Sequence, residues 1–374
     1  MRVAVVHGYY SSRVPSGENV VVDLQVAALR RAGHDVEVFA IRQDEAEQSR
    51  GYVVGAAWRA ATGRGPAPDL DRFAPDVVHV HNLFPNFGRR WTGQYDDRLV
   101  ATLHNYRPIC PAATLFRDGH DCAECPDAGN ARPAVQHACY RDSRLATVPV
   151  ALGTRFADDP LLRSATRLVV LNDDMAERYA AVGVPRDKLV TVPNFVPDPA
   201  APDGAPAQRN HWLYVGRLAE EKGILPLVER WPAGHRLLVV GAGPLEQPVR
   251  RAALDRPEID LLGMVGHDEV LRLLAGAHGL VFPSLWPEGL PTVYLEALAA
   301  GTPVLASPES VVGRLVAEQG TGVVVAGDWA AALADVEARP ELGARCRAVF
   351  EEHYTERAWL ARIETVYAGL NRRR

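Results

Sequence analysis

The stretch FPSLWPEGLPTVYLEALAAGTPV, residues Phe282–Val304, holds the local signals that decide the fold of the C-terminal half. An apolar run typical of a buried strand ends at Phe282 and is followed by a short loop. A helix is predicted from Pro291, because the fixed φ of proline suits the first helical position. A strand that leads through a loop into a helix is the repeating unit of a parallel sheet covered by helices. The stretch therefore predicts an α/β domain.

The same alternation of strand and helix extends in both directions along the chain. In the C-terminal half we expect a helix from about Gly223 and strands at Trp212–Val215, Leu237–Val240, Ile259–Leu262, Leu280–Phe282 and Pro303–Ala306. In the N-terminal half we expect a helix at Glu18–Arg31 and strands at Arg2–Val6, Asp35–Ile41, Val77–Val80, Leu99–Leu103, Arg167–Leu171 and Leu189–Val192. The pattern predicts two Rossmann-like, doubly wound parallel-sheet domains.

A proline-rich segment separates the two halves. PDPAAPDGAPAQ, Pro197–Gln208, has four prolines among twelve residues, which disfavours both helix and sheet. We expect an N-terminal domain of residues 1–205 and a C-terminal domain of residues 206–354, with a last helix within 355–374 that returns to the first domain. Two open α/β domains bind ligands beyond the carboxyl ends of their strands, so a site in a cleft between them is predicted.

Composition excludes several classes of protein. The chain has 374 residues, of which 47% are hydrophobic and 23% charged, as in globular and not disordered proteins. Its net charge of −5 gives no electrostatic footprint for nucleic acid. The sequence shows neither a secretory signal nor a run of 18 apolar residues, so we expect a cytoplasmic protein whose membrane contact is at most peripheral. Its richness in Ala, Arg, Pro and Gly suggests a bacterial source.

Two carboxylates mark the loop and the helix of the first stretch. Glu288 lies in the loop and Glu296 lies eight residues later, inside the predicted helix. Carboxylates accept hydrogen bonds from sugar hydroxyls, and backbone amides at a helix start bind phosphate. The segment Gly289–Thr292 supplies that helix start. The alternative is that both glutamates are solvated surface acids.

A second motif, YVGRLAEEKGI, opens the C-terminal domain at Tyr214–Ile224. Arg217 follows a predicted strand and Lys222 precedes a predicted helix, so two cations meet at a turn suited to a diphosphate. The alternative is that both form surface salt bridges with Glu220 and Glu221.

The two motifs resemble the EX7E and GRLxxxKG signatures of retaining, GT-B fold glycosyltransferases of family 4. That resemblance implies transfer of a sugar from a nucleotide diphosphosugar. It implies that Glu288 contacts the donor sugar, that Glu296 contacts the ribose, and that Arg217 and Lys222 bind the diphosphate. It also implies donor contacts from a run of four residues: Gly289, Leu290, Pro291 and Thr292.

Glycines and an asparagine give further candidate donor contacts. VVGAGPLE begins like a dinucleotide-binding fingerprint, but Glu246 stands where the third glycine belongs, so an NAD enzyme is the weaker alternative. In the resembled family this turn lies near the nucleotide, which makes Gly241 and Gly243 candidates. Gly17 corresponds to the family's glycine-containing first loop, and Asn194 to its segment before the linker.

Histidines and asparagines mark the expected acceptor side. TLHNYRPICP, Thr102–Pro111, follows a predicted strand and resembles the segment of the family's active-site histidine, which is His104 here. HVHNLFPNF precedes it and offers His81, Asn82 and Asn86 as acceptor contacts. A lone histidine at a strand end is otherwise a hydrogen-bonded structural residue.

Four of the five cysteines are clustered in the sequence. Cys110, Cys122, Cys125 and Cys139 have the spacing C-x11-C-x2-C-x13-C, which can form a tetrahedral thiolate site for structural zinc. His120 and His137 are substitute ligands, and buried thiols or a redox pair are the alternatives. The segment resembles a subgroup of family 4 with HNYRxxCP and CxxC motifs. Cys346 is expected in the core.

The predicted function is that of a retaining hexosyltransferase. The resemblance implies transfer from a UDP-, GDP- or TDP-sugar to a hydroxyl of a glycan, a lipid-linked or a natural-product acceptor, without a catalytic metal. A nucleotide-sugar epimerase of the same fold and a binding module without turnover are the alternatives. The acceptor, the base and the oligomeric state stay open.

Overall fold

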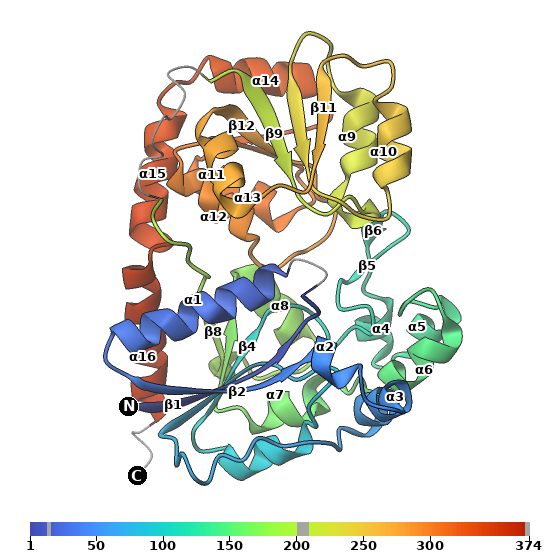
Figure 1. Cartoon of the computed structure of the whole chain (residues 1–374), viewed down its shortest axis with the longest axis vertical. Helices are drawn as coiled ribbons and strands as arrows, with labels where there is room; N and C mark the ends of the chain where they lie inside the picture. The colour runs from blue at the N-terminus through green and yellow to red at the C-terminus, as the bar shows by residue number, and fades with distance from the viewer. Residues whose placement is uncertain (13–15, 200–208, 371–374) are drawn as a thin grey trace. The chain divides into compact units, whose positions relative to one another are not determined.

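The structure is a computed structural model that describes residues 1–12, 16–199 and 209–370. The chain divides into two compact units, one of residues 1–115, 122–194 and 356–374, the other of residues 116–121 and 195–355. Within the described residues each unit contains a six-stranded parallel sheet with helices packed around it (Figure 1). The predicted doubly wound α/β architecture is confirmed. The expected boundary between residues 205 and 206 lies outside the described residues.

The first unit is built on a sheet with the strand order β2-β1-β3-β4-β7-β8. Its strands are β1 (Arg2–Tyr9), β2 (Asp35–Arg42), β3 (Val77–Asn82), β4 (Leu99–Leu103), β7 (Arg167–Val170) and β8 (Leu189–Thr191). Its helices are α1 (Gly17–Arg31), α2 (Gln43–Ala46), α3 (Tyr52–Thr62), α4 (Glu124–Ala128), α5 (Arg132–Gln136), α6 (Arg144–Gly153), α7 (Pro160–Ser164), α8 (Asp173–Ala181) and α16 (Glu356–Leu370). Every residue of β3 and β4 is buried, as expected for central strands covered on both faces.

The last helix of the chain packs within this first unit. Tyr367 of α16 is buried, and its hydroxyl lies 2.7 Å from Nδ1 of His79 on β3. His34, after α1, lies 2.9 Å from the Glu364 carboxylate through its Nε2. Helix α16 therefore packs against the first sheet, although it follows the second unit in the sequence.

The second unit repeats the arrangement with the strand order β11-β10-β9-β12-β13-β14. Its strands are β9 (His211–Val215), β10 (Leu237–Val240), β11 (Ile259–Gly263), β12 (Ala277–Phe282), β13 (Val304–Ala306) and β14 (Gly322–Val324). Its helices are α9 (Ile224–Arg230), α10 (Glu246–Ala252), α11 (His267–Ala275), α12 (Thr292–Ala299), α13 (Val311–Gln319), α14 (Trp329–Glu337) and α15 (Leu342–His353). Strand β14, which consists of three half-buried residues, was not predicted.

Two short strands, β5 (Phe116–Arg117) and β6 (His120–Asp121), form an antiparallel pair between β4 and α6. The residues that follow in the sequence build a small apolar cluster around Cys125, Ala131 and Ala134.

Among the described helices, none combines the length and the apolar character needed to cross a bilayer.

Candidate active site

The second unit brings the two sequence motifs together at the carboxyl ends of β9 and β12. Lys222 follows β9 and lies 2.7 Å, through its Nζ, from Oε2 of Glu288 in the loop after β12. Ser284 donates a hydrogen bond to the other carboxylate oxygen of Glu288. Both side chains are sheltered, with exposed fractions of 20% for Lys222 and 6% for Glu288. Glu288 is therefore not the solvated surface acid of the alternative interpretation.

Aromatic rings and a glycine hold this pair in place. The Lys222 ammonium lies 5.4 Å from the centre of the Trp286 ring and 5.9 Å from that of Phe282, which are cation–π distances. The next residue, Gly223, has a φ of +65°, and a Cβ there would lie 2.0 Å from the Pro283 carbonyl oxygen. Only glycine allows the Lys222 loop to lie this close to the Glu288 loop.

Arg217 lies apart from this buried pair. Its side chain is 63% exposed, and its guanidinium is 3.8 Å from the Glu221 carboxylate. Tyr214, buried at the end of β9, donates a hydrogen bond of 2.9 Å to the Arg217 carbonyl and so fixes the backbone of the loop. In this structure Arg217 therefore forms the surface salt bridge of the alternative interpretation, whereas Lys222 pairs with Glu288.

Helix α12 carries the second glutamate of the first motif. Glu296 is buried, and burial raises the pKa of its carboxyl, while His267 at 4.0 Å acts in the opposite direction. Pro291 is the N-cap in an extended conformation and not the first helical residue, so the predicted helix start is one residue too early. Pro291 also lacks an N–H, which leaves amide donation in this run to its neighbours Gly289, Leu290 and Thr292.

The glycine-rich turn after β10 packs on the loop that carries Arg217. A Cβ on Gly241, whose φ is +137°, would lie 1.9 Å from the Gly216 carbonyl oxygen. A Cβ on Gly243 would lie 2.4 Å from the Leu218 carbonyl oxygen. These contacts give both glycines a structural reason to be there, independent of any nucleotide.

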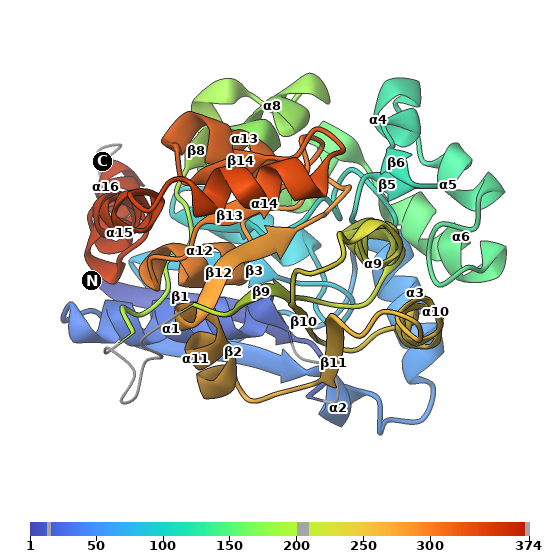
Figure 2. The same cartoon turned by 90° about the horizontal axis from the view of Figure 1, so that it is seen from above.

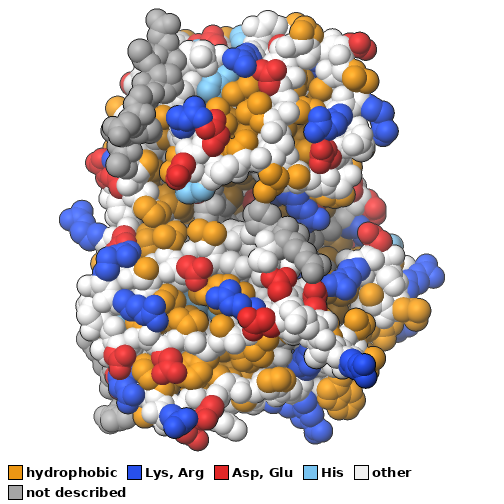
Figure 3. Space-filling view, viewed as in Figure 1, with side chains coloured by type: hydrophobic (Ala, Val, Ile, Leu, Met, Phe, Trp, Pro, Cys, Tyr) orange, Lys and Arg blue, Asp and Glu red, His pale blue; other side chains and the backbone are white. Residues whose placement is uncertain are grey.

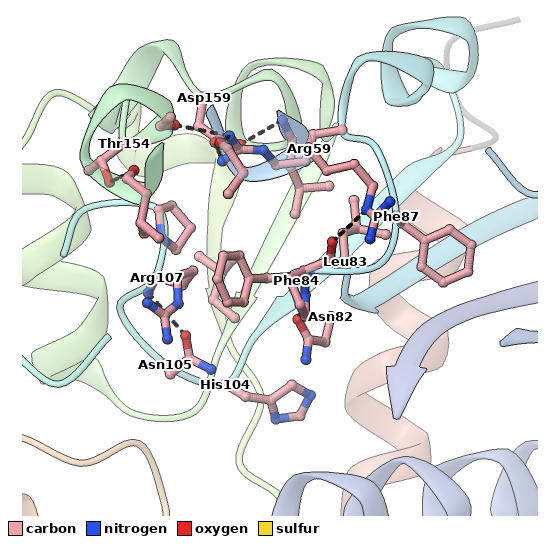
Figure 4. Close-up of a pocket in the computed structure, with 18 of the residues that line it drawn as sticks. Arg59, Asn82, Leu83, Phe84, Phe87, His104, Asn105, Arg107, Thr154 and Asp159 are labelled. Carbon is pink, nitrogen blue, oxygen red and sulfur yellow. Dashed lines mark hydrogen bonds and ion pairs between the residues drawn. The ribbon is translucent and has the colours of Figure 1, made fainter. Parts of the chain in front are cut away.

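The first unit contains a pocket at the carboxyl ends of β3 and β4 (Figure 4). Its empty volume is about 710 Å³. The walls combine polar residues at or just after the ends of the two strands, including Asn82, His104 and Arg107, with inner residues of α3 and α6. His104 and Asn105 lie at its lower side in Figure 4, and Arg59 and Asp159 lie opposite.

Two histidines of this pocket, His81 and His104, belong to a group of stacked imidazole rings. Nδ1 of His81 lies 3.0 Å from Nε2 of His104, and the two rings are stacked. The His81 ring also stacks on that of His79, with ring centres 4.3 Å apart. Burial lowers the pKa of His104 to about 3 and that of His79 to about 3. These imidazoles are therefore neutral near pH 7, and one ring of the His81–His104 pair donates to the other.

Glu18, Asn105 and Arg107 form a polar group that the sequence analysis did not select. The Asn105 amide donates to Oε2 of Glu18 over 3.3 Å, and Oε1 of Glu18 is buried without a partner among the described residues. Burial raises the pKa of Glu18 to about 8, against the opposing effects of Asn105, Arg107, Asn82 and Tyr10. Glu18 is next to Gly17 in the sequence, and Asn105 is next to His104. Their position beside two selected residues was the only sequence signal that could have marked them as candidate site residues.

Three other predicted residues have internal roles in the first unit. Gly17 opens α1, where Ser16 caps the helix by accepting from the Asn19 amide, and a Cβ on Gly17 would meet no atom within 4 Å. Asn194 is buried and accepts a 3.3 Å hydrogen bond from Gln25. Asn86 is buried and accepts from the Tyr52 hydroxyl.

Of the four cysteines clustered in the sequence, Cys125 is buried and packs with the half-buried Cys139, while Cys110 and Cys122 are half-buried. Burial raises the pKa of the Cys125 thiol to about 12, and the charges of Cys110, Cys139 and Cys122 raise it further. Cys346 is buried in the second unit, as expected. In the part of the chain that the structure describes, no three His, Cys, Asp or Glu side chains are placed so that they could hold a metal ion.

Comparisons with known proteins identify the family of the chain. A family model described as "Glycosyl transferases group 1" matches residues 209–338, and one described as "Glycosyl transferase 4-like domain" matches residues 16–194. A phosphatidyl-myo-inositol mannosyltransferase of Mycobacterium leprae is 31% identical over 341 residues, which cover 87% of this chain and 84% of the relative. The chain belongs to the glycosyl transferases group 1 family.

Two further proteins resemble the chain in sequence or in structure. A 2-deoxystreptamine N-acetyl-D-glucosaminyltransferase of Streptomyces fradiae is 32% identical over 275 residues, which cover 66% of this chain but only 58% of the relative. The structure resembles that of Anabaena HepE in complex with UDP and glucose, with a TM-score of 0.62 at 14% identity, over 99% of this chain and 100% of the other. The chain is thus a glycosyltransferase of the GT-B fold.

Proposed function

We propose that this glycosyltransferase moves a sugar from a nucleotide diphosphosugar to an acceptor hydroxyl with retention of the anomeric configuration. The observation that carries the proposal is the sheltered pair of Lys222 and Glu288, which places a cation and a hydrogen-bond acceptor 2.7 Å apart at the start of α12. A diphosphosugar presents the matching groups, an anionic phosphate next to a hydroxylated ring. Because the similar HepE structure contains bound UDP, a UDP-sugar is the first donor to test.

Different residues of the proposed site bind the diphosphate, the sugar and the ribose of the donor. Lys222 and Arg217 neutralise the diphosphate, together with the amide-bearing run Gly289, Leu290 and Thr292 and the N-terminus of α12. Glu288 accepts from the sugar hydroxyls and Glu296 from the ribose diol. Arg217, which is exposed as it stands, turns toward the phosphates on binding. Gly241 and Gly243 act by supporting the Arg217 loop.

The reaction then needs positioning and charge stabilisation more than a protein nucleophile. The bond between the anomeric carbon and the phosphate oxygen breaks, a bond between that carbon and the acceptor oxygen forms, and the acceptor proton moves to the leaving phosphate. The neutral His104 ring offers a hydrogen-bonding group to the sugar at the transfer position. We assign acceptor binding to the pocket of His104, His81 and Asn82, with Asn86 as a supporting residue. Gly17 and Asn194 remain proposed donor contacts.

The epimerase alternative is not favoured, since the named relatives are transferases. A screen of the purified protein against UDP-, GDP- and TDP-sugars tests the proposal, with thermal shift and mass spectrometry as the readouts. Stabilisation by one donor and release of its nucleotide support it. The appearance of a new sugar nucleotide without an acceptor contradicts it.

We further propose that Cys110, Cys122, Cys125 and Cys139 hold a structural zinc ion that ties down the segment between β4 and α6. The support is the ligand type and the spacing of the four cysteines in the sequence, together with the small apolar cluster around Cys125, which buries little surface. The described thiols do not form a ligand group as they stand, so the ion would have to draw them together. The five cysteines lie in described residues and none is in a disulfide, which fits a cytoplasmic enzyme. Elemental analysis of the wild type and of Cys125→Ser decides the point: zinc bound to both, or to neither, contradicts it.

A further inference from the structure

Two helices of the first unit carry an unusual share of the exposed apolar side chains. Eleven large hydrophobic residues are exposed among those that the structure describes, and six of them lie on α3 and α6. We name these six the α3–α6 face: Val53, Val54, Trp58, Leu145, Val148 and Leu152. Their exposed fractions reach 75% for Val54 and 87% for Leu145. Hydrophobic side chains gather beside basic side chains where α3 lies, at the lower right of Figure 3, and the basic residues of this segment are all arginines.

The two helices form one surface and not two separate ones. They lie side by side in both views of the molecule (Figure 2). A Cβ on Gly153 of α6 would lie 1.8 Å from the Ala60 carbonyl oxygen of α3, so the two backbones are in direct contact. Neither helix contains aspartate, glutamate or lysine. An ordinary surface helix has a polar outer side, and this pair lacks one.

The charges around the face are mainly positive. Within the two helices and five residues of their ends there are six arginines and three acids, although the whole chain has a net charge of −5. The arginines are Arg50, Arg59, Arg64, Arg141, Arg144 and Arg155, and the acids are Glu47, Asp142 and Asp158. Five of these arginines are exposed, the exception being Arg59, which donates to the Pro85 carbonyl.

We propose that the α3–α6 face docks on the surface of an anionic lipid bilayer. Leucine, valine and tryptophan enter the boundary between headgroups and acyl chains, while the arginines bind the lipid phosphates. A second copy of the chain fits less well, because a symmetric contact would place the same arginines against one another. A bilayer complements both the apolar side chains and their basic surroundings.

The face is continuous with the candidate acceptor pocket, which ties the proposal to the proposed function. Arg59 and Ala60 of α3, with Val150 and Gly153 of α6, line that pocket from within. The outer sides of the same helices carry the apolar face. A lipid-linked acceptor would thus keep its lipid in the bilayer while its polar group enters the pocket beside His104. The acceptor class we infer is therefore lipid-linked.

Flotation of the full chain with vesicles tests the docking step without any substrate. Vesicles of phosphatidylcholine alone are compared with vesicles containing phosphatidylglycerol, for the wild type and for Leu145→Glu/Leu152→Glu. Leu254→Glu is the matched control, because Leu254 is 78% exposed and lies in the second unit. Exposed leucines tolerate this change without unfolding, which the thermal midpoint verifies.

We expect the wild type and Leu254→Glu to float with the phosphatidylglycerol vesicles and to dissociate at high salt. The double variant should lose about tenfold or more in vesicle affinity. No flotation of the wild type, or equal flotation of the double variant, overturns the proposal. The proposal is also overturned if the wild type is a dimer and the double variant is a monomer, because the face would then be an interface between two copies of the chain. Donor binding is measured on the same samples, so failure of docking and failure of the proposed function are distinguished.

Discussion

Lys222 and Glu288 stand 66 positions apart in sequence, and their ammonium and carboxylate groups lie 2.7 Å apart in the second unit. This pair joins the loop after β9 to the loop after β12. The chain has only two lysines among its 41 basic residues, and one of them holds this position. A compact ammonium fits between Glu288 and the Trp286 ring, where the planar, forked guanidinium of arginine would need more room.

Replacing Lys222 by alanine should lower turnover strongly while leaving the fold intact. The change removes the half-buried positive charge that, in the proposed site, stabilises the leaving diphosphate, and loss of such a group costs about 100-fold or more in kcat. Release of nucleotide from the donor, followed over time, gives the rate. Lys222→Arg should recover only part of the activity, because its geometry differs.

The other lysine of the chain provides the control for this prediction. Lys188 donates to the Arg163 carbonyl in the first unit, and Lys188→Ala removes the same group away from the site. Its turnover should stay within about twofold of the wild type, since surface changes have small effects. Equal losses in both alanine variants would show that Lys222 has no specific role.

Glu288→Ala should separate sugar recognition from nucleotide binding. In the proposed site Glu288 accepts from sugar hydroxyls and does not touch the base. Affinity for the free nucleoside diphosphate should therefore stay nearly unchanged, while kcat/KM for the diphosphosugar falls about 100-fold. Calorimetry with the nucleotide and steady-state kinetics with the donor give the two values. A parallel loss of both would place Glu288 at the phosphates instead.

Two glycines give opposite predictions for stability. Gly241→Ala should lower the thermal midpoint by several degrees, because the φ of +137° and the 1.9 Å approach of its Cβ to the Gly216 carbonyl both resist the new side chain. Gly17→Ala should keep or raise the midpoint, since its Cβ meets nothing and alanine favours a helix. A loss of activity in stable Gly17→Ala would mark this residue as a ligand contact.

The sequence predicted the sheets better than the site. Strands β4 and β10 have the predicted bounds, because each is a short apolar run between clear turn signals. The Lys222–Glu288 contact joins loops 66 residues apart, and no local pattern encodes such a distance. The α3–α6 face was also not anticipated, since apolar residues at helical spacing predict a buried side as readily as an exposed one.

Glu18 shows what local patterns miss, because only the fold buries its carboxyl. Burial is the main cause that raises the pKa of Glu18 from 4.5 to about 8. The folded protein therefore holds a proton on Glu18 between these two pH values, where the unfolded chain releases it. The stability contributed by this proton is complete below pH 4.5 and is lost as the pH rises to about 8.

Glu18→Gln keeps a neutral side chain of the same shape at every pH, so its stability lacks this dependence. The thermal midpoint of the variant minus that of the wild type should increase from pH 5 to about pH 8 and level off by pH 9, as the wild type becomes charged beside Asn105 and Arg107. Thermal unfolding in a series of buffers of equal ionic strength measures the difference. A constant difference over this range would mean that Glu18 is ionised throughout, with Arg107 outweighing its burial.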